Sequence, residues 1–168
     1  MAMFIHFAPE TAVAHILRRG ISPSRRRLWD DCSKGTYAVP VTRNFYVSHQ
    51  WLRELKRRGC GTIMGVYFRV PDDEQVWVGH YARKHRMMTA ARALAEFMAA
   101  RNAEGWEVII PRRIEAKEIH RTKRLPQVLG WRYFPEAKGK KPFCPCKYCT
   151  RGEFGARRLR ARLHVRGR

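Results

Sequence analysis

Two strand-forming segments separated by a turn, between residues 62 and 81, constrain the fold more than any other part of the sequence. Residues 62–70, TIMGVYFRV, are rich in β-branched and aromatic side chains, which favour strands. The next four residues, Pro-Asp-Asp-Glu, have the composition of a turn, and residues 75–81 have the pattern of a further strand. We therefore expect this part of the chain to build a β-sheet.

Helices and additional strands are expected around these segments. Pro9-Glu10-Thr11 opens a helix that ends at Gly20, which suits the left-handed position after a helix. A short helix is predicted at residues 50–58, and Pro40 indicates an edge or a bulge in the strand that contains it. The additional strands are predicted at residues 3–8, 37–42 and 106–111.

The longest helix is predicted over residues 84–101. Apolar side chains recur there at positions i, i+4, i+7 and i+11, which is the spacing of one helix face: Met87, Ala91, Leu94 and Met98. The elements together predict an α+β fold with a small mixed or antiparallel sheet and two or three helices.

The composition changes beyond Pro135. Residues 138–168 contain eleven Lys and Arg side chains and one acidic residue, with a cysteine cluster among them. We therefore predict two parts, a main domain at residues 1–135 and a basic, cysteine-containing appendage at residues 136–168.

The charge of the 168-residue chain indicates an anionic partner. The chain has 35 Lys and Arg against 14 Asp and Glu, a formal net charge of +21. Nucleic acid is the partner that such an excess favours, while association with ribosomes or with an acidic membrane surface would also fit. The side chains expected to contact phosphates are Arg112, Arg113, Arg157, Arg158, Arg160 and Arg162.

We expect a cytoplasmic protein. No apolar run approaches the ~20 residues that span a bilayer, and the N-terminal segment lacks a basic stretch before an apolar one. Five cysteines, an odd number, indicate a reducing compartment rather than a set of disulfides.

Glu107 is a carboxylate at the start of the apolar run Val108–Ile110. An acidic side chain on a strand that is expected to be buried either has a partner or takes part in chemistry. Exposure to solvent or an ion pair with Arg112 would give it a purely structural role.

Two stretches resemble the ADP-ribosyltransferase superfamily. They are FIHFAPETAVAHILRRGI, residues 4–21, and WEVIIPRRIEAKEI, residues 106–119. Within the superfamily they look most like the bacterial toxins that ADP-ribosylate DNA bases (the DarT family), and more distantly like the RNA 2′-phosphotransferases. Those toxins have a histidine-containing strand that leads into a helix, and a catalytic glutamate in an apolar strand that is followed by proline and isoleucine.

The resemblance implies an enzyme that transfers ADP-ribose from NAD to DNA or RNA. It assigns catalysis to Glu107, His6 and Arg27, of which Glu107 would stabilise an oxocarbenium-like transition state and accept the proton of the nucleophile. NAD would be bound by His6, Arg25, Arg27, Tyr37 and Tyr46, with Arg26 an equal candidate in the same loop. An antitoxin or inhibitor protein is a further partner that the resemblance implies.

The cysteine cluster FCPCKYC predicts a structural zinc site. Cys144, Cys146 and Cys149 can converge on one ion, and zinc takes four ligands in structural sites. We favour Cys60 as the fourth ligand because it would tie the appendage to the main domain, with Cys32 and His164 as alternatives. Unliganded thiols and an iron–sulfur cluster remain open.

Two functions of other classes compete with the transferase. One is a non-catalytic, zinc-stabilised protein that binds nucleic acid. The other is a nuclease that uses His80 and His85, which the scarcity of paired acidic residues disfavours.

Overall fold

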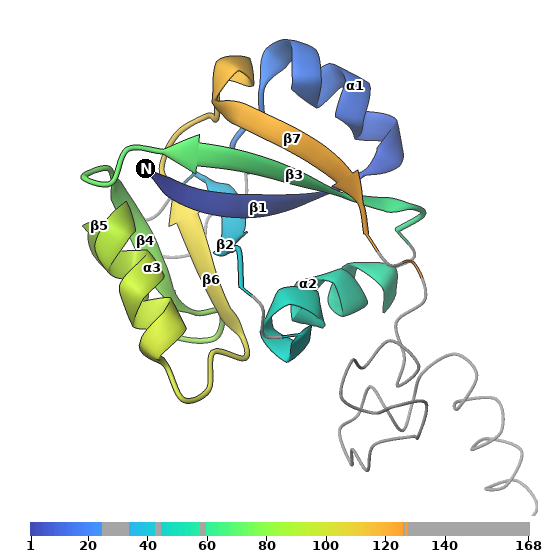
Figure 1. Cartoon of the computed structure of the whole chain (residues 1–168). Coiled ribbons are helices and arrows are strands. Elements are labelled where there is room, and N and C mark those ends of the chain that lie inside the picture. The colour runs from blue at the N-terminus through green and yellow to red at the C-terminus, as the bar shows by residue number, and fades with distance from the viewer. Residues whose placement is uncertain (25–33, 43–44, 58–59, 126, 128–168) are drawn as a thin grey trace, which may run out of the picture. The chain divides into compact units, whose positions relative to one another are not determined.

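The computed structural model describes residues 1–24, 34–42, 45–57, 60–125 and 127, and all that follows concerns these residues (Figure 1). Met1–Gln127 form one compact unit. The side chains of residues 45, 46, 48, 49 and 57 are also outside the description. The predicted boundary at residue 135, the cysteine cluster and the arginines of the appendage lie outside the described residues.

A seven-stranded antiparallel sheet organises the described residues, in the order β5-β4-β6-β2-β1-β3-β7. The strands are β1 (Ala2–Pro9), β2 (Thr36–Pro40), β3 (Ile63–Val70), β4 (Gln75–His80), β5 (Arg86–Thr89), β6 (Trp106–Ile110) and β7 (Ile119–Arg124). The helices are α1 (Glu10–Arg19), α2 (Phe45–Arg57), α3 (Ala90–Ala99) and the short 3-10 helix η1 (Ala116–Glu118). The predicted α+β class is confirmed, and every strand pair is antiparallel.

A narrow junction joins the two halves of the sheet. β1 and β2 pair at only two positions, Phe4 with Pro40 and Ile5 with Val39. β1 pairs with β3, in contrast, along its whole length from Ala2 to Pro9. Figure 1 shows β1, β3 and β7 running across the direction of β4 and β6. The backbone ladder between the halves therefore ends next to His6.

The main core lies on the sheet face that α1 and α3 cover. Large side chains from both halves of the sheet contribute to this core. Phe4 of β1 and Phe68 of β3, for example, have ring centroids 6.1 Å apart. α1 contributes Ile16, and α3 contributes Ala90 and Ala93. The remaining strand residues of this core include Val66, Val70, Val76, Val78, Val108 and Ile110.

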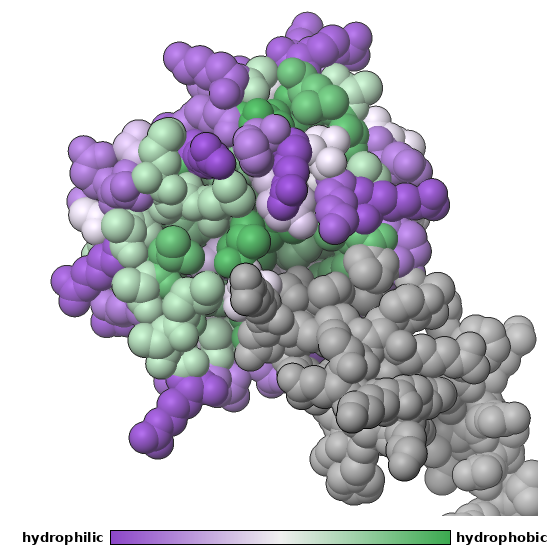
Figure 2. Space-filling view, in the orientation of Figure 1, coloured by the Kyte–Doolittle hydropathy of each residue, from purple (hydrophilic) through white to green (hydrophobic). Residues whose placement is uncertain are grey.

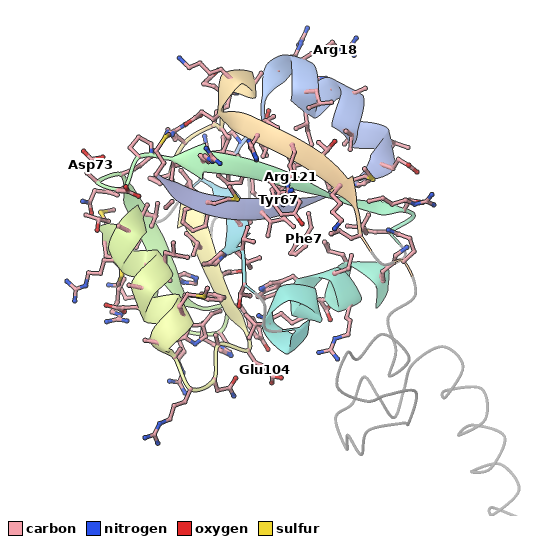
Figure 3. All side chains as sticks on the ribbon, in the orientation of Figure 1. Phe7, Arg18, Tyr67, Asp73, Glu104 and Arg121 are labelled. Carbon is pink, nitrogen blue, oxygen red and sulfur yellow. The ribbon has the colours of Figure 1, made fainter. Side chains whose placement is uncertain are left out.

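A smaller apolar cluster lies on the opposite face of the sheet. Its buried members are Ile5, Val39 and Tyr67, and Trp51 of α2 packs against them. Figure 2 shows apolar surface at the centre of the face turned to the viewer, between β1 and α2, with hydrophilic side chains around it. Figure 3 places Phe7, Tyr67 and Arg121 together on this face. We call it the α2 face.

The helix predicted over residues 84–101 is wrong in its first part. Residues 86–89 form β5 and pair with β4, and α3 begins only at Ala90. The Thr89 hydroxyl accepts a hydrogen bond from the Arg92 N–H, which fixes this start. The predicted apolar face is wrong for Met87 and Met98, which are exposed, whereas Leu94 packs against the main core. The fully buried side chains of α3 are Ala90, Ala93 and Phe97.

Two smaller predictions change as well, and one strand was not predicted. Pro40 ends a central strand rather than an edge strand, and it pairs there with Phe4 of β1. The short helix predicted at residues 50–58 begins earlier, at Phe45. Strand β7 was not predicted, since its sequence IHRTKR shows charge rather than apolar alternation.

Gly20 ends α1 as predicted. Its φ is 77°, and a Cβ at this position would collide with the carbonyl oxygen of Ile114. Ile21 and Ile114 exchange backbone hydrogen bonds of 2.8 and 3.1 Å, so the chain after α1 is fixed beside the end of β6. A glycine is needed here both for its conformation and for its size.

Candidate active site

Glu107 occupies the centre of the sheet, on β6 between β4 and β2. It pairs with Gly79 of β4, and the residue is only 7 % exposed. Among the described residues it is the one acidic residue that is buried. A carboxylate in such a place must be stabilised by its surroundings, because removal from water disfavours the charged form.

His85 is the side chain that meets this carboxylate. It lies in the loop between β4 and β5, and its Nε2 is 3.3 Å from Oε1 of Glu107. The His85 side chain is fully buried, while a tenth of the Glu107 side chain remains exposed. The two atoms are at ion-pair distance, but the N–H does not point at the oxygen, and neither ring nitrogen has a hydrogen-bond partner among the described residues.

Gly79 makes room for the His85 side chain. A Cβ at Gly79 would lie 3.2 Å from Cα and 3.4 Å from Cγ of His85, which is tighter than an ordinary contact. Because Gly79 is the register partner of Glu107, the space left by the missing side chain is where the histidine reaches the carboxylate. The role of Gly79 is to leave space for His85, and no sequence motif predicts this role.

The faces of the sheet decide which predicted residues meet. Paired residues of neighbouring strands share a face, and successive residues alternate between faces. Tyr37 pairs with Ile109, so it lies on the same face as Glu107. This is the α2 face, because Val108 and Trp106, the neighbours of Glu107 in β6, both belong to the main-core side.

His6 points to the other face. It pairs with Val66 of β3, which belongs to the main core, so the register separates its side chain from Glu107. Its Nδ1 donates a hydrogen bond of 2.7 Å to the carbonyl oxygen of Tyr37, across the junction where the backbone ladder has ended. Burial lowers the pKa of His6, and this hydrogen bond only partly offsets the effect. His6 is therefore a neutral side chain that ties β1 to β2.

Arg112 pairs with two carboxylates, and neither of them is Glu107. Its guanidinium donates to Glu74 at 2.6 and 2.7 Å and to Glu118 at 2.6 and 2.7 Å. The hydrogen bonds to Glu118 and Glu74 raise the pKa of Arg112 above its ordinary range. The hydrogen bond from Arg112 lowers the pKa of Glu118. The ion pair between Arg112 and Glu107 that would have given the glutamate a structural role does not form.

This arrangement also changes what Arg112 can offer to a phosphate. Its charge is balanced by the two glutamates, which hold the turn before β4 and helix η1 against the end of β6. Arg113 is exposed and its carbonyl accepts a hydrogen bond from Arg112. Of this pair, Arg113 has the side chain that faces solvent.

Arg121 brings a positive charge to the α2 face. It pairs with Tyr67 of β3, and its guanidinium carbon lies 4.7 Å from the centre of the Tyr67 ring (Figure 3). Such a stacked arginine keeps its N–H groups available while the ring holds its orientation. The face therefore carries one buried carboxylate, several aromatic rings and an exposed arginine.

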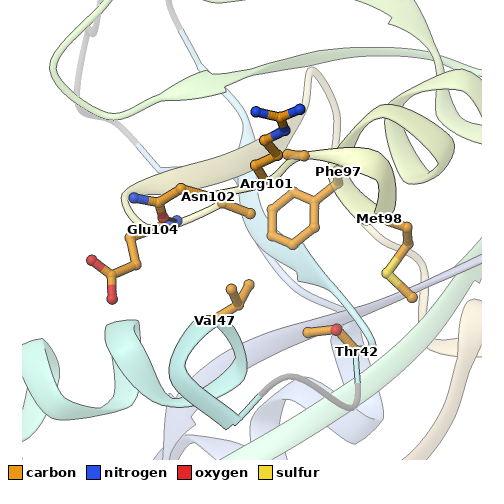
Figure 4. Close-up of a pocket in the computed structure, with 9 residues that line it drawn as sticks. Thr42, Val47, Phe97, Met98, Arg101, Asn102 and Glu104 are labelled. Carbon is orange, nitrogen blue, oxygen red and sulfur yellow. Dashed lines mark hydrogen bonds between the residues drawn. The ribbon is translucent and has the colours of Figure 1, made fainter.

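A pocket of about 410 Å³ lies beside the site rather than on it (Figure 4). It lies between the start of α2 and the end of α3, and residues of the turn before β6 line one side of it. Its lining contains none of the predicted site residues: Thr42, Val47, Phe97, Met98, Ala100, Arg101, Asn102, Ala103 and Glu104. The pocket lining contains no buried carboxylate comparable to Glu107, so we place the candidate active site at Glu107.

Three of the predicted site residues cannot be placed together with Glu107, because they or their side chains are not among the described residues. Arg25 and Arg27 are outside the described residues, and Tyr46 is in the first turn of α2 with its side chain outside the description. Cys60 is a free, partly exposed cysteine after α2. Among the described residues, no three histidine, cysteine or acidic side chains gather in a way that could hold a metal ion.

The chain matches no family model, no curated protein and no solved structure to which it was compared. No helix of the described part is both long and apolar enough to cross a membrane.

Proposed function

We propose that this protein transfers ADP-ribose from NAD to nucleic acid, with Glu107 as the catalytic carboxylate. The observation that carries the proposal is the placement of Glu107, a buried carboxylate in contact with His85 on a face lined with aromatic side chains. Its one basic neighbour among the described residues, His85, lies at ion-pair distance but forms no hydrogen bond with it. The arginine nearest in sequence, Arg112, is bound to two other acids.

The chemistry needs a negative charge in a place with little water. Cleavage of the bond between nicotinamide and ribose develops positive charge on the ribose, and a carboxylate at that point lowers the barrier. The same carboxylate accepts the proton that the attacking amino or hydroxyl group of the nucleic acid loses. The leaving nicotinamide takes the electron pair of the broken bond, and the nucleophile forms the new bond to the ribose carbon.

The other residues of the α2 face suit the two substrates. Tyr37 and Trp51 present aromatic surface that fits a flat nicotinamide ring. Arg121 offers a cation to a phosphate on the same face. His6 is a positioning residue in this scheme, since its hydrogen bond to the Tyr37 carbonyl fixes β2 relative to β1.

Nucleic acid is the acceptor that the charge favours. The net charge of +21 belongs to a chain with few acids, and several of the described acids are already in ion pairs with arginines. A chain of this kind gains affinity by releasing counterions from phosphates. Protein is the acceptor class that this argument disfavours.

The proposal is tested by incubating the full chain with labelled NAD and separate pools of DNA, RNA and protein. We predict label on DNA or RNA, and a loss of at least 10²-fold in rate for Glu107→Gln, which keeps the shape and removes the charge. Glu104→Gln is the matched control, because Glu104 is exposed and only three residues away (Figure 3). Equal rates for the two variants would remove Glu107 from the mechanism, and label on protein alone would refute the choice of acceptor.

A further inference from the structure

Tyr81 stands at the surface in a fixed aromatic stack. The residue is 55 % exposed, although it follows directly after β4. Its ring stacks on that of His80, with centroids 4.6 Å apart and planes tilted by 29°. The Trp51 ring stands nearly perpendicular to it, with centroids 5.7 Å apart and planes at 87°. An aromatic ring that is both exposed and held on two sides is available to a ligand without loss of its own freedom.

Backbone and side-chain hydrogen bonds hold each member of the stack. The Tyr81 N–H donates to the Gly105 carbonyl at 2.8 Å, and the Trp51 indole N–H donates to the Trp106 carbonyl at 2.9 Å. His80 accepts from two N–H groups of the following turn, one at its carbonyl and one at Nδ1. The stack is thus built from α2, from β4 and from the turn before β6. Its orientation is set before any ligand arrives.

The segment that carries Tyr81 is positively charged. Residues 75–95 contain no acidic residue, and Arg83 and Lys84, which follow Tyr81 closely, are exposed. Arg86 and Arg92 of the same region pair with Glu96, whereas the Arg83 side chain has no ion pair with any described residue. An exposed ring beside an arginine fits a ligand that has both a flat face and a phosphate.

The stack is also close to the candidate catalytic carboxylate. Gly79 is the partner of Glu107, and Tyr81 is two residues further along, where its N–H continues the ladder to Gly105. Two residues of extended chain span about 7 Å. A base on the Tyr81 ring would therefore lie within one nucleotide of Glu107.

We propose that Tyr81 is the stacking platform for an unpaired base of single-stranded nucleic acid, with the adjacent phosphate beside Arg83. Single strands are favoured over duplexes because the faces of paired bases are covered by their neighbours, while an unpaired base can stack on a protein ring. The inference rests on the proposed function where it names nucleic acid as the acceptor. The binding that it describes does not require the transferase reaction.

The test measures the affinity of the full chain for one oligonucleotide, single-stranded and annealed to its complement, without NAD. Tyr81→Ala should weaken single-strand binding by about 5- to 150-fold, the usual value of one stacked base, and should change duplex binding by less than about twofold. Tyr81→Phe and Tyr81→Trp keep an aromatic ring and should retain most of the affinity. Met87→Ala is the control, since it removes another half-exposed apolar side chain of the same hairpin.

Three results would overturn the platform. They are unchanged single-strand affinity in Tyr81→Ala, an equal loss for single strand and duplex, and a wild-type protein that binds neither. Thermal melting of each variant shows whether the fold survives, and Tyr81→Leu, which keeps apolar bulk but has no flat ring, carries the test if Tyr81→Ala does not fold. Tyr81-dependent binding without transfer of ADP-ribose would refute the proposed function alone, and transfer with normal binding by Tyr81→Ala would refute the platform alone.

Discussion

The contact between His85 and Glu107 makes the clearest energetic prediction. His85→Phe keeps a ring of similar size in the buried position and removes both nitrogens. The Glu107 carboxylate then loses the polar group that lies 3.3 Å away, with only a tenth of its side chain open to water. Loss of this neighbour costs the carboxylate about 1–3 kcal/mol, and removal of two buried ring nitrogens that lack hydrogen-bond partners offsets part of it, so we expect a smaller net loss of unfolding free energy.

A double-mutant cycle separates this effect from the cost of repacking. Glu107→Gln in the same protein removes the charge, so His85→Phe should cost at least about 0.5 kcal/mol less in that background. Urea unfolding of the wild type, both single variants and the double variant gives the four free energies. Gly79→Ala is a milder version, since its Cβ would press on Cα and Cγ of His85 without removing either partner.

Activity of the same variants completes the test. If His85 orients Glu107, His85→Phe should lower kcat for transfer of ADP-ribose more than it raises KM for NAD. Additive free energies in the cycle, within about 0.3 kcal/mol, would show that the two side chains do not interact. His85 would then not stabilise or orient the Glu107 carboxylate, even if Glu107 were essential by itself.

Three further predictions concern pH and metal. The lowered pKa of Glu118 stabilises the fold fully above the ordinary carboxyl value of 4.5, and this contribution disappears as pH falls through the lower folded value, so Glu118→Gln should flatten acid unfolding curves in that window. The lowered pKa of His6 means that stability falls as pH drops below 6.5, and His6→Gln should remove this slope between pH 6.5 and the folded pKa. Elemental analysis should find one zinc per chain, lost on substitution of the cysteines at 144, 146 and 149, and a metal content near zero would contradict the zinc site.

The sequence was sufficient for most of the elements and insufficient for their contacts. The strands β1, β3, β4 and β6 were predicted because apolar and β-branched side chains dominate them. The segment at residues 86–89 was assigned to a helix because its methionines also fit helical spacing, and only pairing with β4 decides between the two. β7 was missed because an edge strand with charged side chains has no apolar signal.

For the candidate site, too, the sequence indicated a single residue but not the residues that contact it. Glu107 could be selected from the sequence because an acid beside an apolar run is unusual. Its partner could not, since His85 lies 22 positions earlier and reaches it only through the register of Gly79 with Glu107. The placement of His6 on the opposite face follows from strand pairing, which single-sequence patterns do not contain.

The proposed transfer of ADP-ribose to nucleic acid changes the mass of the acceptor, and this mass can be measured. A synthetic single-stranded oligonucleotide is incubated with NAD and the full chain, and both the oligonucleotide mass and the released nicotinamide are measured. We predict that the oligonucleotide gains the mass of one ADP-ribose for each nicotinamide released, and that Glu107→Gln abolishes both changes together. An unchanged mass for DNA and RNA alike, whether or not nicotinamide is released, would contradict it.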